Sequence, residues 1–115
     1  MALVATTRRF SFRGVHSLNT GAHKEKCHGH QFFLEVSFHR CEAEDVEREV
    51  RSAVLERLDK RDLTQVIQPA TGEVLVEWIH NELESGPLQG CILGVALQET
   101  RKNRFVSRRT NAWLI

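Results

Sequence analysis

The sequence HGHQFFLEVSFH, residues 28–39, predicts a β-strand, because an apolar side chain stands at every second position along most of its length. Successive side chains of a strand point to opposite faces, so residues two apart share a face. His28 and His30 therefore continue the apolar face of this strand. Gly29 points the other way and has no Cβ, which lets a ligand or another backbone approach closely.

A second strand is predicted at about residues 7–15, with two phenylalanines on one face and His16 in register with them at its end. If the two strands pair as a hairpin, His16 converges with His28 and His30. Three neutral imidazoles with an open fourth position are the ligand set of a catalytic zinc ion. The alternative is that they are ordinary surface or core histidines, since two histidines two apart occur in strands by chance.

The other histidines differ in their relation to this site. His23 falls in the polar loop that connects the two strands, so it is a rival metal ligand. His39 lies on the opposite face of its strand and His80 lies in a predicted helix, and neither has a paired ligand nearby. Both are interpreted as structural or solvated.

The rest of the chain predicts two helices and then two strands. The acid-rich segment Glu42-Ala43-Glu44-Asp45 begins a helix, in which apolar residues recur at helical spacing: Val46, Val50, Ala53, Val54 and Leu58. Thr71 is predicted as the N-cap of a second helix that ends at Gly86-Pro87, with an apolar stripe formed by Leu75, Trp78, Ile79 and Leu83. Residues 91–100 predict a strand with one face formed by Leu93, Val95, Leu97 and Glu99, and residues 104–109 predict a weaker one.

The order ββααββ predicts a single α+β domain over residues 1–115, in which two helices cover one face of a four-stranded antiparallel sheet. The strand at residues 28–39 also has apolar residues on both faces, such as Phe32 and Phe33. We therefore expect the edges or the second face of the sheet to meet other subunits.

Composition restricts the class of partner. The chain has 16 basic and 15 acidic residues and a formal charge of +1, which argues against a general nucleic-acid or membrane binder and favours a small molecule. Three cysteines, Cys27, Cys41 and Cys91, lack the spacing of a disulfide framework and fit a reducing compartment. No stretch has the length of a signal peptide or a membrane span, so a cytoplasmic location is predicted.

Five features, in this order along the chain, resemble the 6-pyruvoyltetrahydropterin synthase / 6-carboxytetrahydropterin synthase family: His16 ending a strand, the HGH strand, Leu58-Asp59, Pro69-x-Thr71-x-Glu73 and Glu99-Thr100. The resemblance covers nearly the full length. It implies the tunnelling fold, in which monomers join their sheets into oligomeric barrels as trimers and hexamers.

The resemblance also implies the site residues. Zinc would be held by His16, His28 and His30, and a pterin by Glu99 with Thr71 nearby. A carboxylate suits this second role, because it can accept hydrogen bonds from the amino group and the ring N–H of a pterin together. Alternatively, Glu99 binds no ligand and is simply exposed to solvent at the end of its strand.

Two departures from the family pattern bear on the reaction. The catalytic cysteine, four or six residues before His28 in other members, is absent, and Cys27 is interpreted as a small buried hydrophobe. Glu25-x-x-His28-Gly29-His30 instead resembles a subgroup in which glutamate replaces the cysteine and the product is 6-hydroxymethyl-7,8-dihydropterin. In addition, Lys60 follows Asp59 where the family has a histidine of the proton relay. A lysine with a lowered pKa can still transfer protons, or the relay is absent and turnover is slow.

The sequence thus predicts a zinc-dependent lyase acting on 7,8-dihydroneopterin triphosphate, with Glu25 as base and Asp59 and Lys60 as proton donors. One alternative is formation of 6-carboxy- or 6-pyruvoyltetrahydropterin, and another is a non-catalytic pterin-binding paralogue. Five basic residues near the end of the chain have two interpretations: they contact the triphosphate of the substrate, or they only protect an exposed sheet edge. They are Arg101, Lys102, Arg104, Arg108 and Arg109.

Overall fold

Strands β1 (Thr6–His16) and β4 (His28–Phe38) form the antiparallel pair that the sequence predicts. Their register sets Phe12 opposite Phe32, and the two rings stack with their centroids 4.9 Å apart. The predicted alternation is confirmed, because the apolar residues on one face of β4 are all buried: Phe32, Leu34, Val36 and Phe38. This pair is the base on which the rest of the domain packs.

The structure is a computed structural model that describes residues 4–16, 19–20, 23–24, 28–99 and 103–109. Within these residues one sheet has the strand order β5-β1-β4-β6-β7. Its remaining strands are β5 (Arg61–Asp62), β6 (Ile92–Gln98) and β7 (Arg104–Arg108). A separate two-stranded sheet consists of β2 (Asn19–Thr20) and β3 (His23–Lys24).

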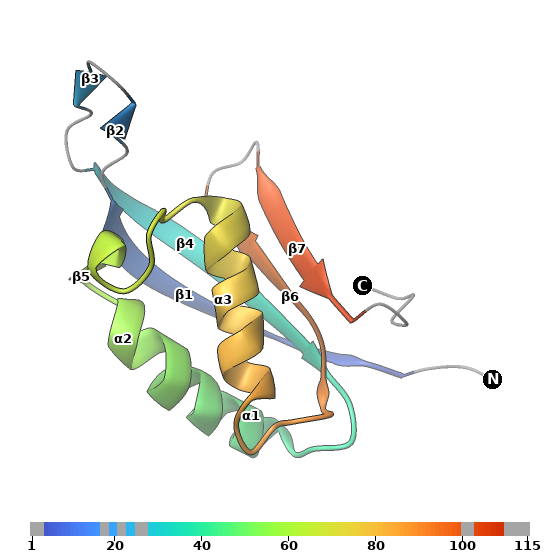
Figure 1. Ribbon diagram of the computed structural model, residues 1–115. Coiled ribbons are helices and arrows are strands. Elements are labelled where there is room, and N and C mark those ends of the chain that lie inside the picture. Colours follow the sequence, from blue (N-terminus) through green and yellow to red (C-terminus); the bar gives the residue numbers. More distant parts are fainter. Residues whose placement is uncertain (1–3, 17–18, 21–22, 25–27, 100–102, 110–115) are drawn as a thin grey trace.

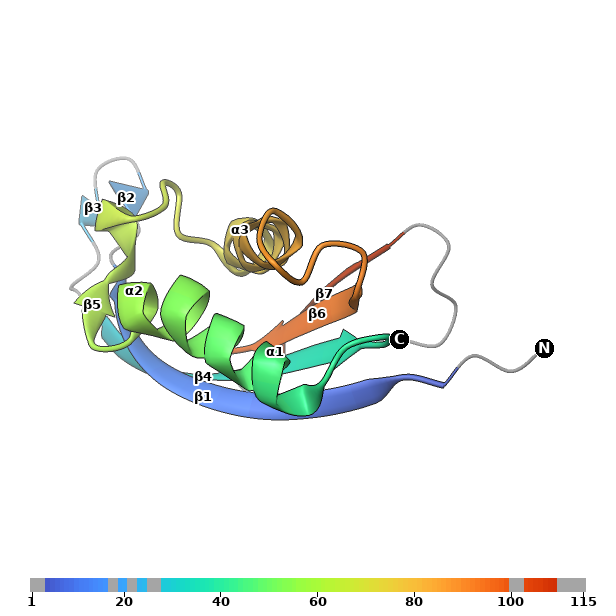
Figure 2. The same cartoon turned by 90° about the horizontal axis from the view of Figure 1, so that it is seen from below.

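Both helical segments lie on the same face of the sheet (Figures 1 and 2). The first runs without a break through α1 (Ala43–Val50), a π-helical stretch (Arg51–Leu55) and α2 (Glu56–Leu58). The second is α3 (Gly72–Glu84), and a short 3-10 turn (Leu63–Gln65) lies between the two. The α+β class with two helices over one sheet face is therefore confirmed.

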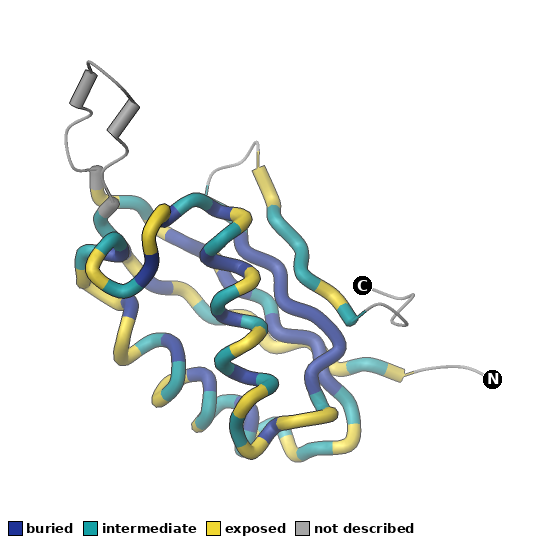
Figure 3. The backbone as a smooth tube through the Cα atoms, viewed as in Figure 1, coloured by how far each residue is buried: buried dark blue, intermediate teal, exposed yellow. Residues whose placement is uncertain are grey.

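The predicted helical stripes form the core together with the sheet. The buried apolar side chains of the helices pack against the buried face of β4 and β6: Val46, Val50, Val54, Leu58, Leu75, Val76, Ile79 and Leu83. Figure 3 shows this as continuous burial along β6 and alternating burial along the helices. Trp78 is half-buried, with the guanidinium of Arg57 4.6 Å above its ring. No helix among the described residues combines the length and apolarity needed to cross a membrane.

The prediction of four strands misses β5, which pairs in parallel with β1 through Gly14↔Arg61 and Val15↔Asp62. Two residues are too few to show a periodic pattern, so this strand arises from the tertiary approach of the chain after α2. Gly14 permits that approach, because a Cβ there would lie 2.7 Å from a methyl carbon of Leu63. The fifth strand extends the sheet on the side of β1.

The predicted face of the strand at residues 91–100 is wrong at its start. Val95 and Leu97 belong to the core cluster, but the register with β4 shifts between Ser37 and Phe38. Ile92 consequently occupies the core position expected for Leu93. A β-bulge depends on the pairing of two strands, so the alternation of one strand does not reveal it.

Candidate functional site

The three predicted zinc ligands occupy neighbouring positions of the β1–β4 pair. His16 is directly opposite His28, and His30 is two residues further along β4, opposite Gly14. Directly opposed residues of antiparallel strands share a face, as do residues two apart on one strand. The backbone register therefore assigns all three histidines to one face, and three imidazoles are a donor set that suits zinc.

The His30 side chain lies next to the predicted pterin-binding carboxylate. Nε2 of His30 is 3.6 Å from Oε1 of Glu99, and both side chains are mostly buried. Glu99 directly follows β6, which pairs with β4, so the sheet brings these two residues together from positions far apart in sequence. An imidazole and a carboxylate at the end of an apolar face can together bind a ligand that carries N–H donors and oxygen atoms.

The side chains of His16 and His28 belong to the part of the chain that the structure does not describe. Among the described residues, no group of three His, Cys, Asp or Glu side chains is placed to hold a metal ion. The predicted base Glu25 also lies outside the described residues, as does Cys27. The rival ligand His23 is described only as part of the backbone of β3.

Asp59 and Lys60 are attached to the edge of β1. The Oδ1 atom of Asp59 accepts the backbone N–H of Arg13 at 2.9 Å, and the backbone N–H of Lys60 donates to the carbonyl of Arg13 at 2.6 Å. Lys60 has φ 59, a left-handed conformation that is uncommon outside glycine. These two hydrogen bonds hold the turn after α2 against the strand that ends in His16.

The turn lies at the same end of the sheet as the histidines. Arg61 pairs with Gly14, and Gly14 pairs with His30, so these residues form one row across β5, β1 and β4. Two strand spacings separate the backbones of Arg61 and His30, which is about 10 Å. The turn that carries Asp59 and Lys60 thus lies at the same end of the sheet as the backbone positions of the predicted metal ligands.

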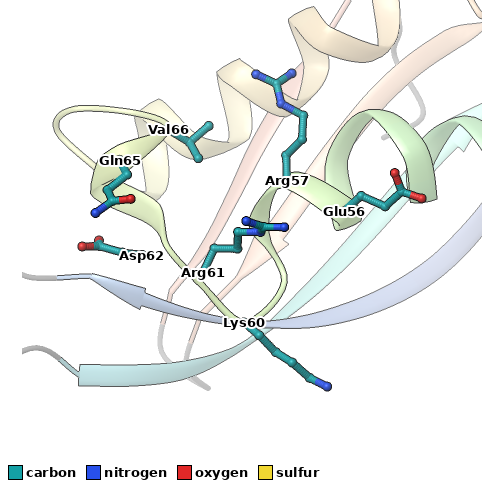
Figure 4. Close-up of a pocket in the computed structure, with 7 residues that line it drawn as sticks. All are labelled: Glu56, Arg57, Lys60, Arg61, Asp62, Gln65 and Val66. Atoms are coloured by element: carbon teal, nitrogen blue, oxygen red, sulfur yellow. The ribbon is translucent and has the colours of Figure 1, made fainter.

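A hollow of about 710 Å³ opens beside this turn, lined by Glu56, Arg57, Lys60, Arg61, Asp62, Gln65 and Val66. Figure 4 shows that the Lys60 side chain extends away from the other lining side chains. Arg57 is already paired with Glu82, at 3.0 Å. The sequence analysis did not identify Arg57 and Arg61 as lining residues, because their position depends on how the turn packs against β1.

Thr71 acts as a helix cap, as its sequence position predicts. Its hydroxyl oxygen accepts the backbone N–H of Val74 at 3.4 Å at the start of α3. The next residue, Gly72, is covered by the ring of Phe105 from β7. This packing fixes the start of α3 against the edge strand of the sheet.

The basic cluster does not converge on one point within the described residues. Arg104 donates to Glu35 of β4 at 2.9 Å, whereas Arg109 donates to Glu84 at the end of α3 at 3.3 Å. Arg101 and Lys102 lie outside the described residues. Since β7 is an outer strand of the sheet, this arrangement favours protection of the edge over a common phosphate site.

The two histidines interpreted as structural have different surroundings. Nδ1 of His80 is hydrogen-bonded to the hydroxyl of Ser107 at 2.8 Å, which supports its structural interpretation. Burial lowers the pKa of His80. The Nε2 atom of His39, just after β4, is buried and has no hydrogen-bond partner among the described residues.

Comparisons with known proteins bear on the family and the fold of the chain. The sequence model of one family, described as 6-pyruvoyl tetrahydropterin synthase, matches residues 5–110. Comparison with curated protein sequences gives no match.

Solved structures share the fold. The 6-pyruvoyl tetrahydropterin synthase of Caenorhabditis elegans superposes with a TM-score of 0.80 at 20% identity, covering 96% of this chain and 98% of that one. The Plasmodium vivax enzyme gives a TM-score of 0.65 at 13% identity, covering 92% and 98%. The Plasmodium falciparum enzyme gives 0.61 at 13% identity, covering 91% and 98%. The observed sheet and helices therefore match the fold of these synthases.

Proposed function

Because the chain belongs to the 6-pyruvoyl tetrahydropterin synthase family, whose members are lyases, we propose that it cleaves 7,8-dihydroneopterin triphosphate in a zinc-dependent reaction. The products would be 6-hydroxymethyl-7,8-dihydropterin and the triphosphate of glycolaldehyde. Two observations support this proposal: the backbone register that pairs His16 with His28, and the 3.6 Å distance between Nε2 of His30 and Oε1 of Glu99.

The proposed metal ligands are His16, His28 and His30. Zinc bound there would supply Lewis acidity, which lowers the pKa of a bound hydroxyl as it does that of water. The Glu99 carboxylate would accept hydrogen bonds from the amino group and the ring N–H of the pterin, and so fix the orientation of the ring. Thr71 is proposed as a further pterin-binding residue.

Glu25 is proposed as the general base. It would remove the proton from the C2′ hydroxyl, after which the C2′ carbonyl forms and the C1′–C2′ bond breaks. The electron pair of that bond passes into the dihydropterin ring system, and a proton then adds at C1′ to leave a hydroxymethyl group. The Plasmodium vivax enzyme has been solved with its catalytic glutamate replaced, and glutamate is the residue type that we place in this role.

Lys60 is proposed as the donor of the proton to C1′. Asp59 is hydrogen-bonded to the backbone of Arg13, so its part is to hold the turn that carries Lys60.

We also propose that the protein is cytoplasmic and that it forms a homo-oligomer, as a trimer or hexamer. Phe33, on the sheet face opposite the helices, is 54% exposed, which is unusual for a large aromatic residue in a small domain. A second copy would cover this face or extend the sheet at β7.

Two features support a second function: the Asp59 carboxylate is hydrogen-bonded to the backbone of Arg13, and Lys60 stands where the family has a histidine. If Asp59 serves only the backbone of Arg13 and Lys60 donates no proton in place of the family histidine, the chain lacks the relay and binds pterins without turnover. This alternative keeps Glu99 as a pterin ligand but assigns no chemistry to Glu25.

The test is incubation of the purified protein with 7,8-dihydroneopterin triphosphate, with and without a chelator, followed by mass spectrometry of the products. Hydroxymethyldihydropterin that disappears with chelator and in a Glu25→Ala variant supports the proposal. A carboxy- or pyruvoyltetrahydropterin product contradicts the proposed bond cleavage, and binding without any product supports the non-catalytic alternative.

A further inference from the structure

Two cysteines lie close together at the end of the sheet away from the histidines. Cys41 is in the connection from β4 to α1, and Cys91 directly precedes β6. The two connections run together at the end of β4 that is opposite to His28 (Figure 1). They are joined by a hydrogen bond from the backbone N–H of His39 to the carbonyl of Cys91, at 2.9 Å.

The side chain of Cys91 lies beside the turn that carries Cys41. Sγ of Cys91 lies 3.7 Å from the carbonyl oxygen of Arg40, the residue before Cys41. Arg40 has φ 60, so a left-handed residue turns the chain at this point. Both cysteines are free and half-buried, which leaves them reachable by a small reagent while the core restrains them.

We propose that Cys41 and Cys91 form a reversible disulfide when the protein meets a small-molecule disulfide of the glutathione class. The bond would join the start of α1 to the start of β6. The part of β4 from His30 to Phe38 separates this pair from the candidate site, a distance of about 25 Å along an extended strand. The proposal is therefore independent of the proposed function.

The exchange has a defined order. Burial and the neighbouring Cys91 raise the pKa of the Cys41 thiol, so the proposal takes Cys91 as the sulfur that reacts first. Its thiolate attacks the external disulfide, forms a mixed disulfide and releases one thiol. Cys41 then loses its proton to solvent and attacks the sulfur of Cys91, which releases the second thiol. Two protein thiols are oxidised and one external disulfide is reduced.

The bond would restrain the unfolded chain. It closes a loop that contains all the helices of the described chain, and a disulfide across a loop of this size lowers the entropy of the unfolded state. We expect the melting temperature to rise by about 10 °C on oxidation and to return on reduction.

The test uses the full chain with Cys27→Ser, so that only the two paired cysteines carry thiols. The protein is incubated with oxidised glutathione, and its mass, free-thiol count and non-reducing tryptic map are recorded. Loss of two hydrogens, loss of both thiols and a peptide linking Cys41 to Cys91 support the proposal. The same treatment of a Cys41→Ser, Cys27→Ser variant should leave a glutathione adduct on Cys91.

Two results would overturn the proposal. One is retention of both thiols after prolonged exposure to oxidised glutathione, while the urea-unfolded protein oxidises in the same buffer. The other is a stable glutathione adduct on either cysteine of the folded Cys27→Ser protein, since a neighbouring thiol would displace it. Neither outcome bears on turnover of a pterin.

Discussion

Asp59 accepts a hydrogen bond from the backbone N–H of Arg13, at 2.9 Å, across the edge of β1. This bond links the end of the first helical segment to the strand that ends in the predicted zinc ligand His16. It gives Asp59 a positional role that can be separated from proton transfer, because an amide oxygen can accept the same hydrogen bond as a carboxylate.

We predict that Asp59→Asn keeps both the fold and the proposed lyase reaction, whereas Asp59→Ala loses about 1 kcal/mol of stability and most of the activity. Urea unfolding and product formation measured on both variants check this. If Asp59→Asn is as inactive as Asp59→Ala while remaining folded, the carboxylate takes part in the proton transfer.

Glu99 should determine pterin binding. Glu99→Gln removes one of the two acceptors offered to the pterin N–H groups, so we expect affinity for a dihydropterin to fall roughly 10- to 100-fold, with the fold intact. Fluorescence titration checks this. Glu35→Gln is the matched control, because Glu35 is a carboxylate on the same sheet that pairs with Arg9 and Arg104 instead. An equal loss in both variants would contradict a specific role for Glu99.

Zinc content should depend on His30. We predict that His30→Ala binds zinc at least roughly tenfold more weakly than the unmodified protein, since one of three imidazole ligands is lost. Elemental analysis after dialysis against a competing chelator measures this. His80→Gln serves as control, because His80 is hydrogen-bonded to Ser107 and lies outside the site. Unchanged zinc in the His30 variant would remove this residue from the ligand set.

Gly72 is expected to tolerate no larger residue. A Cβ there would lie 2.1 Å from Cε2 of Phe105, so Gly72→Ala should cost about 1–3 kcal/mol of stability. Gly86→Ala is the control, because the nearest atoms to its Cβ are 3.9 Å away and we expect little change. Adding Phe105→Leu should recover part of the loss, and failure to do so would show that the strain lies elsewhere.

Stability should fall in mild acid because of His80. Burial lowers its pKa from 6.5, an effect that Glu84 partly opposes and Arg109 reinforces. The folded protein thus favours the neutral ring, so this contribution is complete above about pH 6.5 and is lost as the pH falls through the lowered folded pKa. The difference in unfolding free energy between wild type and His80→Gln should change over this range. A constant difference from pH 7.5 to pH 5 would contradict the shift.

Periodicity was enough to predict the two long strands, both helices and most of the core. The face of β4 from Phe32 to Phe38 and the cap at Thr71 follow from local rules, since alternation and hydrogen bonding of the first helical turn act within a few residues. The pattern also identified the histidines as a group, because their faces depend only on strand alternation.

The tertiary structure decided which distant residues meet. The contact of His30 with Glu99, the attachment of Asp59 to Arg13 and the contact of Cys91 with Arg40 each join segments that no local pattern relates. The strand β5 and the bulge that places Ile92 in the core arise in the same way. Local preferences act through neighbouring backbone atoms, whereas these contacts depend on how the helical layer and the strands pack in three dimensions.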